Sequence, residues 1–464
     1  MSPRPVPASR RRPDLWARGQ ARVDAASLTL FRIVVGLLLC ASALRFELRG
    51  WVDTLIVEPS FHFHYWGFEW ISEPSPWLAH ALVALTAVAG LGIAWGRALR
   101  GWSLTAFCSF TWLELVDLSY YLNHYYFVSI LLLSFTLIPP RPQADGQIPR
   151  WWLWFFRAQV GMVYAYAGLA KLDADWLLHA QPLKIWLARS ADLPGIGPWL
   201  DEPWVAYAAA WAGAAFDLLV VPLLCVARTR RLAYAALLSF HLFTGLLFPI
   251  GVFPWLMSAA ATIFFAPAWP RRVPLLGFTR LEEPTTSKAS ESAAVQTSGA
   301  TPLELLRRAA AALALGLLFI ELALPLRHWA QPGPVAWNEV GGRFAWRVML
   351  VEKGGAVRFE VVDETTGARS HFEGDEELTD LQKKAMSTQP DMIAEYARHL
   401  RARAEAERPE GRFVVYVHAR VSVNGRPSRP FIDPNVDLSR AEFGLATPTW
   451  ILPSPLDGND EPRK

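Results

Sequence analysis

The sequence predicts a mainly α-helical, multi-pass membrane bundle followed by a soluble mixed α/β, β-rich domain. Of the 87 charged side chains, 39 lie in residues 331–464, whereas long stretches of residues 1–330 are nearly free of charge. The chain also carries 22 tryptophans, whose amphipathic rings favour the membrane–water interface. We do not expect a single soluble domain, because it would expose far too much apolar surface.

Nine stretches approach the length and apolarity of a spanning helix, which needs about 20 mostly apolar residues. They lie at approximately 27–45, 77–95, 101–118, 121–138, 153–170, 204–226, 232–248, 251–267 and 304–325. The third and fourth contain Glu114, Asp117 and His124, and the seventh and eighth are short. Each of these four could instead be a buried helix that never touches lipid.

Basic residues predict the orientation, because cytoplasmic loops are rich in Lys and Arg. The first 26 residues are Arg-rich, and arginines recur in every second loop. They are Arg97, Arg100, Arg141, Arg150, Arg228, Arg230, Arg231, Arg271, Arg272 and Arg280. The alternate loops are poorer in basic residues. We therefore expect a cytoplasmic N-terminus and an extracytoplasmic C-terminal domain.

The domain organisation follows from these patterns. We expect a cytoplasmic basic arm, a transmembrane bundle, a Ser/Thr/Ala-rich cytoplasmic linker, a last transmembrane helix, a soluble extracytoplasmic domain and a disordered tail. Their expected bounds are 1–26, 27–270, 271–303, 304–325, 331–456 and 457–464.

The soluble domain is expected to be α+β or β-sandwich-like. Residues 356–367 and 412–427 alternate like strands, with Asn424-Gly425 as a tight turn. Residues 378–407 have helical spacing that is interrupted at Pro390.

Cysteine usage and net charge exclude other classes of function. Cys40, Cys108 and Cys225 all lie in apolar stretches and offer neither a disulfide framework nor a metal-binding pattern. A net charge of +3 gives no reason to expect nucleic acid as a partner. We expect no metal centre.

Ionisable side chains inside spans are costly, so they are the first functional candidates. On the predicted topology Lys171 ends the fifth span, His124 begins the fourth, and His241 lies about ten residues into the seventh, all at the outer level. His62 and His64 belong to the first outer loop. This convergence is typical of a site near the outer leaflet.

Each candidate also has a purely structural interpretation. A lysine at a helix end usually extends to water, and a histidine can simply bond a neighbouring helix. Glu114 and Asp117 lie three residues apart and could serve a proton path or pair with Arg157. The residue pattern alone leaves these alternatives open.

Nine segments of the chain carry a family resemblance. They are YLNHYYFVSILLLSFTLIPP, FFRAQVGMVYAYAGLAKLDADWL, FDLLVVPLL, FHLFTGLLFPIGVFPWLM and APAWPRR in the membrane part, and PGPVAWNEVGGRFAWRVMLVEKGG, LTDLQKKAMSTQPDMI, VNGRPSRPFIDPNVDL and WILP in the tail. They resemble the vitamin K-dependent gamma-glutamyl carboxylase family, whose membrane part is also called the HTTM domain. The likeness covers roughly residues 25–455, and AGLAKLDADWL (167–177) is its most specific piece.

The resemblance implies an activity and its cosubstrates. Enzymes of this family oxidise reduced vitamin K with O₂ to the epoxide, and the strong base made in that oxidation removes a γ-proton from a protein glutamate, which then takes up CO₂. For this chain the resemblance implies reduced vitamin K or menaquinol, O₂ and CO₂, and a glutamate-containing protein substrate on the extracytoplasmic side.

The resemblance also assigns residues. By motif, the general base falls on Lys171 and the two functional histidines on His124 and His241. A lysine must be neutral to accept a proton, and burial at an apolar helix end disfavours the ammonium. Further candidates for binding the quinol are Asn123, Arg157, Gln159, Tyr164, His62 and His64. Gln159 and Tyr164 could line the same groove as Lys171, but so could a plain packing face.

Departures from the family keep a second function open. No cysteine is placed for the disulfide of the animal enzymes, and Ala170 stands where these have a second lysine. The Ala-, Arg- and Trp-rich composition indicates a bacterial protein of the inner membrane. The alternative is a non-catalytic or repurposed membrane protein that binds a quinone, lipid or partner through the same groove.

Overall fold

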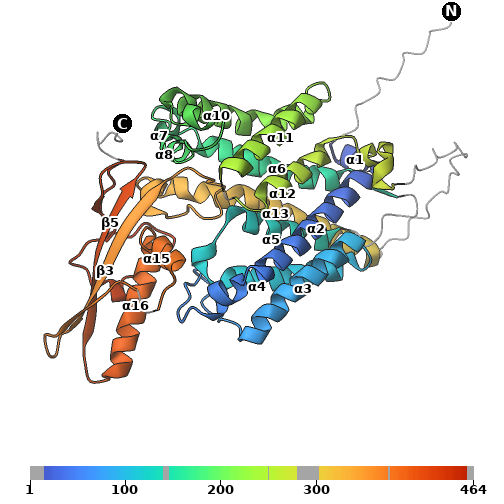
Figure 1. Ribbon diagram of the computed structural model, residues 1–464. Helices are drawn as coiled ribbons and strands as arrows, with labels where there is room; N and C mark the ends of the chain where they lie inside the picture. The colour runs from blue at the N-terminus through green and yellow to red at the C-terminus, as the bar shows by residue number, and fades with distance from the viewer. Residues whose placement is uncertain (1–14, 139–145, 249, 279–301, 375–376, 457–464) are drawn as a thin grey trace, which may run out of the picture.

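The computed structural model describes residues 15–138, 146–248, 250–278, 302–374 and 377–456. It consists of a helical body and a C-terminal domain built around a β-sheet. The first helix, α1 (Leu15–Gln20), and the C-terminal domain lie at opposite ends of the helical body (Figure 1). The expected disordered tail, 457–464, most of the expected linker, 279–301, and the start of the basic arm, 1–14, lie outside the described residues.

Each of the nine predicted spans coincides with a helix. These helices are α2 (Ala26–Leu48), α3 (Pro76–Trp95), α4 (Leu99–Val116), α5 (Asn123–Leu137), α6 (Trp151–Ala170), α10 (Pro203–Cys225), α11 (Arg230–Leu247), α12 (Phe253–Ala261) and α13 (Pro302–Ala323). Within the described residues, α2, α3, α10 and the segment Leu305–Ala330 are long and apolar enough to cross a membrane. The helical body therefore has the character of an integral membrane protein, and the number of nine spans stays a prediction.

Small residues allow α2 and α3 to pack backbone against backbone. A Cβ added at Gly36 would lie 2.5 Å from the carbonyl oxygen of Gly90, and one added at Gly90 would lie 2.6 Å from that of Gly36. Only glycine at both positions permits this approach, which is a common way for membrane helices to associate.

The loop between α6 and α10 folds into three short helices, α7 (Ala174–Leu177), α8 (Leu183–Ala188) and α9 (Gly197–Leu200). Asp173 caps α7, because its carboxylate accepts a hydrogen bond from the backbone N–H of Asp175 at 2.9 Å. The Trp176 indole donates to the carbonyl of Ala210 in α10 at 2.8 Å. These contacts hold the acidic segment after α6 against the helical body.

The opposite end of the body carries a two-stranded sheet that the sequence did not predict. Strand β1 (Arg22–Asp24) pairs antiparallel with β2 (Gln147–Pro149). Asp24 also forms an ion pair with Arg271, with 2.7 Å between Oδ2 and Nε. Part of the expected basic arm and one arginine of a later expected cytoplasmic loop therefore meet at this end.

The C-terminal domain is an α+β domain. Its strands β3 (Lys353–Asp363), β4 (Arg369–Phe372), β5 (Phe413–Val423) and β6 (Arg429–Pro430) form one antiparallel sheet in the order β4-β3-β5-β6. Within the described residues this domain has one sheet, so the β-sandwich alternative is wrong. The reason is that the helical segment, rather than a second sheet, packs against the β3–β5 pair.

Local predictions for this domain are confirmed. Helix α15 (Asp380–Met386) ends before Pro390, which begins α16 (Pro390–Glu407). Asn424 and Gly425 follow β5 with φ angles of +50° and +77°, as expected for a tight turn with left-handed backbone.

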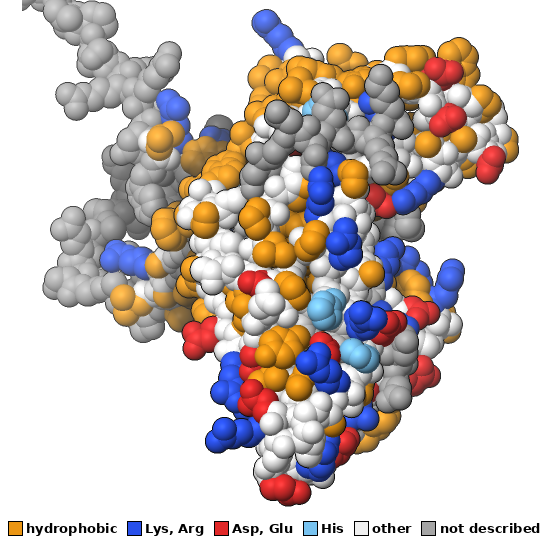
Figure 2. All heavy atoms as spheres, turned by 90° about the vertical axis from the view of Figure 1, so that its left-hand side faces the viewer, with side chains coloured by type: hydrophobic (Ala, Val, Ile, Leu, Met, Phe, Trp, Pro, Cys, Tyr) orange, Lys and Arg blue, Asp and Glu red, His pale blue; other side chains and the backbone are white. Residues whose placement is uncertain are grey.

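The C-terminal domain is docked on the helical body through apolar and polar contacts. Phe63 and Leu118 of the body belong to the same buried cluster as the sheet. Gln382 donates to Asp117 and to the carbonyl of Phe61, both at 2.7 Å. Figure 2 faces this domain and shows charged side chains dense over the lower part of the view, whereas hydrophobic side chains are prominent in the upper part, where the helical body lies.

Candidate functional site

An apolar cavity of about 390 Å³ lies between α6, α10 and α11. We name it the quinol cavity after the ligand that the sequence resemblance leads us to expect. Its polar lining includes Lys171, Asp217, His241 and Tyr164. Three of these four residues, all except Asp217, are candidates from the sequence. The structure therefore brings together predicted residues from separate helices in one cavity.

Lys171 follows the last residue of α6 and forms a buried ion pair. Its Nζ lies 2.7 Å from Oδ2 of Asp217, and the two side chains are only 8% and 6% exposed. Nζ also donates to the carbonyl of Ala167 at 3.3 Å and lies 5.2 Å from the Trp176 ring centroid. The lysine does not extend to water, so the structural interpretation of a lysine at a helix end does not apply.

His241 is held in one orientation from α11. Its Nε2 is 2.7 Å from the hydroxyl oxygen of Tyr164 on α6. Its Nδ1 is buried without a hydrogen-bond partner among the described residues. When the tyrosine hydroxyl donates to Nε2, the neutral imidazole carries its hydrogen on Nδ1. That nitrogen is then a buried donor of a residue that lines the cavity.

The remaining wall of the quinol cavity is mostly aromatic and aliphatic. Phe216 and Phe240 stack at 4.0 Å between ring centroids, and Phe253 lies 5.9 Å from the His241 ring. Val348 and Met349, from the segment that precedes β3, line another part of the cavity. The C-terminal domain region therefore contributes to a cavity whose polar groups come from the helical body.

His124 lies just outside the lining of this cavity. It is the second residue of α5, and its ring centroid lies 5.9 Å from that of Phe253, whose ring is equally far from His241. The two histidines thus flank one phenylalanine. Asn123 accepts a hydrogen bond from the Tyr121 hydroxyl at 3.0 Å and is not part of the cavity lining.

Arg157 and Gln159 lie elsewhere on α6. Arg157 donates to the carbonyls of Ile263 and Phe265 at 2.9 and 3.1 Å. It precedes Lys171 by fourteen residues, which is about 21 Å along a helix. Gln159 donates to Ser134 at 2.9 Å and to Glu321 at 2.8 Å. Neither residue lines the quinol cavity.

His62 and His64 lie in the loop between α2 and α3. His62 Nε2 lies 3.1 Å from the carbonyl oxygen of Ile56, and His64 Nδ1 lies 2.7 Å from Glu395 of α16. The hydrogen bond to Glu395 raises the pKa of His64. Both histidines lie outside the quinol cavity, and His64 takes part in the contact between the loop and the C-terminal domain.

Glu114 and Asp117 do not share a partner. Asp117 accepts from Gln382, whereas Glu114 lines a separate small cavity near Tyr125. Arg157 is engaged by backbone carbonyls, so it pairs with neither carboxylate in the described contacts.

Asp217 is the main functional candidate that sequence reasoning missed. It lies in an apolar stretch, the predicted span 204–226, and an ionisable residue in a span is a candidate by default. The same rule that selected Lys171 would therefore have selected Asp217. Their pairing could not be foreseen because the two residues are 46 positions apart.

Comparisons with known families match both parts of the chain. The model of the HTTM domain matches residues 20–269, which is more than half of the 464 residues. The model described as the lumenal domain of vitamin K-dependent gamma-carboxylase matches residues 307–457. No solved structure matches the chain.

Proposed function

Since this chain belongs to the vitamin K-dependent gamma-carboxylase family with its HTTM domain, we propose that it is a membrane-embedded gamma-glutamyl carboxylase. In this proposal it oxidises a reduced naphthoquinol, either vitamin K or menaquinol, with O₂ to the epoxide. The base made in that reaction serves to carboxylate a protein glutamate with CO₂. The observation that carries the proposal is the placement of Lys171 and His241 in one apolar cavity.

The lining of the quinol cavity fits a reduced quinol. Its walls are apolar and aromatic, as suits a ring with a prenyl tail, and about 390 Å³ is in the range of small-molecule sites. The unpartnered Nδ1 of His241 offers one buried donor for a quinol oxygen. When bound, the quinol supplies the acidic hydroxyl and the electrons for O₂.

Lys171 is proposed as the general base that accepts the quinol proton. To do so it must first be neutral, and Asp217 at 2.7 Å is an acceptor for the ammonium proton. Burial disfavours charges, so the low exposure of both side chains reduces the advantage of the ion pair over the neutral amine and acid. Asp217 is then a positioning residue for Lys171.

His241 and Tyr164 are proposed to orient the quinol. The Tyr164 hydroxyl fixes the imidazole, and Nδ1 then faces a reacting oxygen as a preorganised donor. His124 is proposed to act from the other side of Phe253, which both imidazoles contact.

The proposal includes an orientation in the membrane. The N-terminus is cytoplasmic, and the C-terminal domain meets a glutamate-containing protein on the extracytoplasmic side, in a bacterial inner membrane. The position of α1 and the C-terminal domain at opposite ends of the body supports this arrangement (Figure 1). The arginines of alternate loops support the direction.

One assay with matched variants tests the proposal. The purified full-length protein is supplied with reduced menaquinone or vitamin K, O₂ and labelled bicarbonate, with and without a glutamate peptide. We expect epoxide and fixed label from the parent, and neither from Lys171→Ala. Lys184→Ala is the control, because Lys184 contacts Tyr207 and does not line the quinol cavity.

The outcomes separate the two functions. If Lys171→Ala makes epoxide at the parent rate, the assignment of the base is wrong. If the parent binds quinol but consumes no O₂, the protein is the non-catalytic quinone-binding alternative. Epoxide without fixed label would support the proposed quinol oxidation and contradict the proposed carboxylation.

A further inference from the structure

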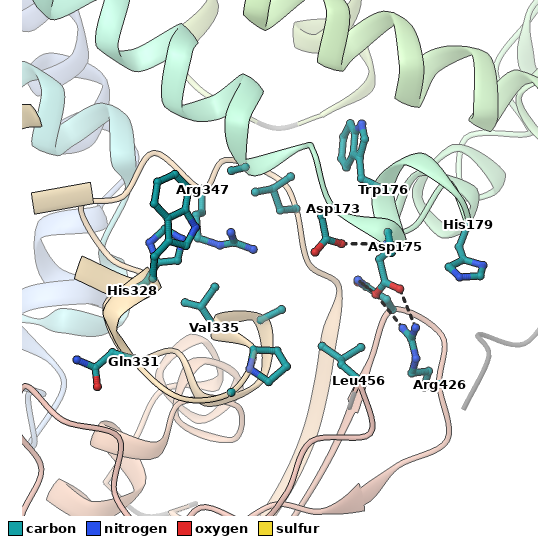
Figure 3. A pocket seen from close by; sticks show the side chains of 18 residues that line it. Asp173, Asp175, Trp176, His179, His328, Gln331, Val335, Arg347, Arg426 and Leu456 are labelled. Atoms are coloured by element: carbon teal, nitrogen blue, oxygen red, sulfur yellow. Dashed lines mark hydrogen bonds and ion pairs between the residues drawn. The ribbon is translucent and has the colours of Figure 1, made fainter. Parts of the chain in front are cut away.

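A second cavity lies between the acidic segment after α6 and the C-terminal domain, and we name it the interdomain cavity. Its volume is about 670 Å³, and its lining includes Asp173, Trp176, His328, Arg347 and Arg426 (Figure 3). Asp173 and Ala174 at its edge are exposed, so the cavity is reached from outside the helical body. Neither the comparisons nor the proposed catalytic residues assign it a role.

The interdomain cavity and the quinol cavity share a wall. Of four consecutive residues, Val348 and Met349 line the quinol cavity, whereas Arg347 and Leu350 line the interdomain cavity. Trp176 lines both, and its ring centroid lies 5.2 Å from Nζ of Lys171. A group held in the interdomain cavity is therefore separated from the proposed base by one layer of side chains.

The charged side chains that line the interdomain cavity differ in whether they have a hydrogen-bond or ion-pair partner. Arg426 holds Asp175 by two contacts of 2.7 and 2.8 Å, and Asn424 donates to the same carboxylate at 2.8 Å. The Asp173 carboxylate caps α7. Arg347 makes no hydrogen bond or ion pair with any residue in the described part of the chain, and Figure 3 shows its guanidinium extending into the hollow towards Asp173.

The environment of Arg347 favours an added anion. Burial lowers the pKa of Arg347, with Glu339 and Asp173 opposing that shift only from a distance. A half-buried cation without a direct partner loses part of its hydration, and a carboxylate offsets this cost while accepting two parallel hydrogen bonds. The nearby carboxylates of Asp173 and Asp175 repel anions, and they repel a multiply charged phosphate more strongly than a ligand with one negative charge.

We propose that the interdomain cavity binds the side-chain carboxylate of a glutamate in an acidic peptide, with Arg347 as its ion-pair partner. The choice of glutamate rests on the proposed function, since a carboxylase must hold this side chain close to its base. The cavity itself requires only a carboxylate. A fatty-acid carboxylate has the same chemistry, and the experiment distinguishes the two.

Binding is measured without any turnover. A fluorescent peptide with one glutamate, the same peptide with glutamine, and a fluorescent fatty acid are titrated into the full-length protein without quinol or bicarbonate. We expect the glutamate peptide to bind the parent about 10- to 100-fold more tightly than the glutamine peptide. Arg347→Gln should remove this preference, and Arg347→Lys should keep part of it, because the charge remains but the planar fork is lost. Arg358→Gln, at an exposed position of β3, is the control and should retain the full preference.

Each result decides the proposal. Equal binding of both peptides by the parent would overturn it without any variant, and so would an undiminished preference in Arg347→Gln. If the fatty acid binds more tightly than the glutamate peptide and its binding depends on Arg347, the ligand of the cavity is a lipid carboxylate and the peptide proposal is wrong. The epoxidation assay is separate, so a parent that prefers glutamate but makes no epoxide supports this binding site and contradicts the proposed function.

Discussion

The Nζ of Lys171 lies 2.7 Å from Oδ2 of Asp217, and neither side chain is more than 8% exposed. A cation and an anion are thus placed inside an apolar cavity with each other as partner. Desolvation makes such a pair a weak source of stability, so its presence suggests a chemical role. Because both side chains are buried, each charge also depends on the other for its compensation.

The first prediction concerns the stability of this pair. Lys171→Met or Asp217→Leu alone leaves one buried charge without its partner, which should lower the free energy of unfolding by about 3–5 kcal/mol. The double variant Lys171→Met/Asp217→Leu removes both charges and should recover most of that loss. Unfolding of all four proteins in mixed detergent micelles measures the coupling.

A surface pair supplies the control for this double-mutant cycle. Arg401 and Glu405 form an i,i+4 pair on α16 at 2.8 Å, with side chains 26% and 43% exposed. Arg401→Ala should change the free energy of unfolding by about 0.5 kcal/mol or less. Additive effects of the two cavity variants would mean that Lys171 and Asp217 do not act as a pair.

The second prediction concerns the hydroxyl of Tyr164. Tyr164→Phe removes the partner of His241 Nε2 and leaves the tautomer of the imidazole free, so kcat for quinol epoxidation should fall about tenfold. The matched control is Tyr166→Phe, on the same helix, whose hydroxyl donates to the carbonyl of Leu322 outside the cavity. Steady-state kinetics of both variants provide the test. Equal kinetics in the two would show that the hydroxyl of Tyr164 does not orient the histidine.

Much of the fold could be predicted because the membrane imposes a simple pattern. Apolar stretches near 20 residues predicted the nine helices that coincide with the expected spans, and the period-two alternation at 356–367 predicted β3. The pairing of β1 with β2 was not predicted. These strands are three residues long, too short for any periodicity to show, and their paired residues are 123 to 127 positions apart.

The sequence predicts a site residue where its residue type alone indicates chemistry. It does not predict one whose role depends on a contact with a residue far away in the sequence. Lys171 and His241 stand out because ionisable groups are rare in spans. Gln159 was a candidate because helical spacing could place it in the same groove as Lys171, yet it contacts Ser134 and Glu321, because the rotation of a helix decides which groove a side chain enters. Arg347 lies in a part of the chain that is rich in charged residues, where one more arginine carries no signal.

The third prediction contrasts two ion pairs between the helical body and the C-terminal domain. Asp175 and Arg426 are 11% and 7% exposed, whereas Glu352 and Arg189 are 29% and 62% exposed. Arg426→Ala should lower the free energy of unfolding by about 3–5 kcal/mol, because it leaves the Asp175 carboxylate buried with only Asn424. Arg189→Ala should cost about 1 kcal/mol or less.

Limited proteolysis of Arg426→Ala and Arg189→Ala tests the same difference between the buried and the exposed ion pair. Loss of the Asp175–Arg426 contact should loosen the C-terminal domain and increase its rate of cleavage, whereas loss of Arg189 should leave the rate unchanged. Similar stability and cleavage in both variants would show that burial of the Asp175 pair is not what holds the two parts together.

The final prediction is a pH dependence at the contact of His64 with Glu395. The hydrogen bond from Nδ1 to the Glu395 carboxylate raises the pKa of His64 above its ordinary value. Folding therefore favours the imidazolium, and this stabilisation is fully present below the pKa of the unfolded state and lost as the pH rises through the raised pKa. Thermal midpoints of the parent and of His64→Asn should differ at about pH 5.5 and converge at about pH 8.5. A difference between parent and His64→Asn that grows with pH would require the opposite shift, and would mean that Glu395 does not stabilise the charged histidine.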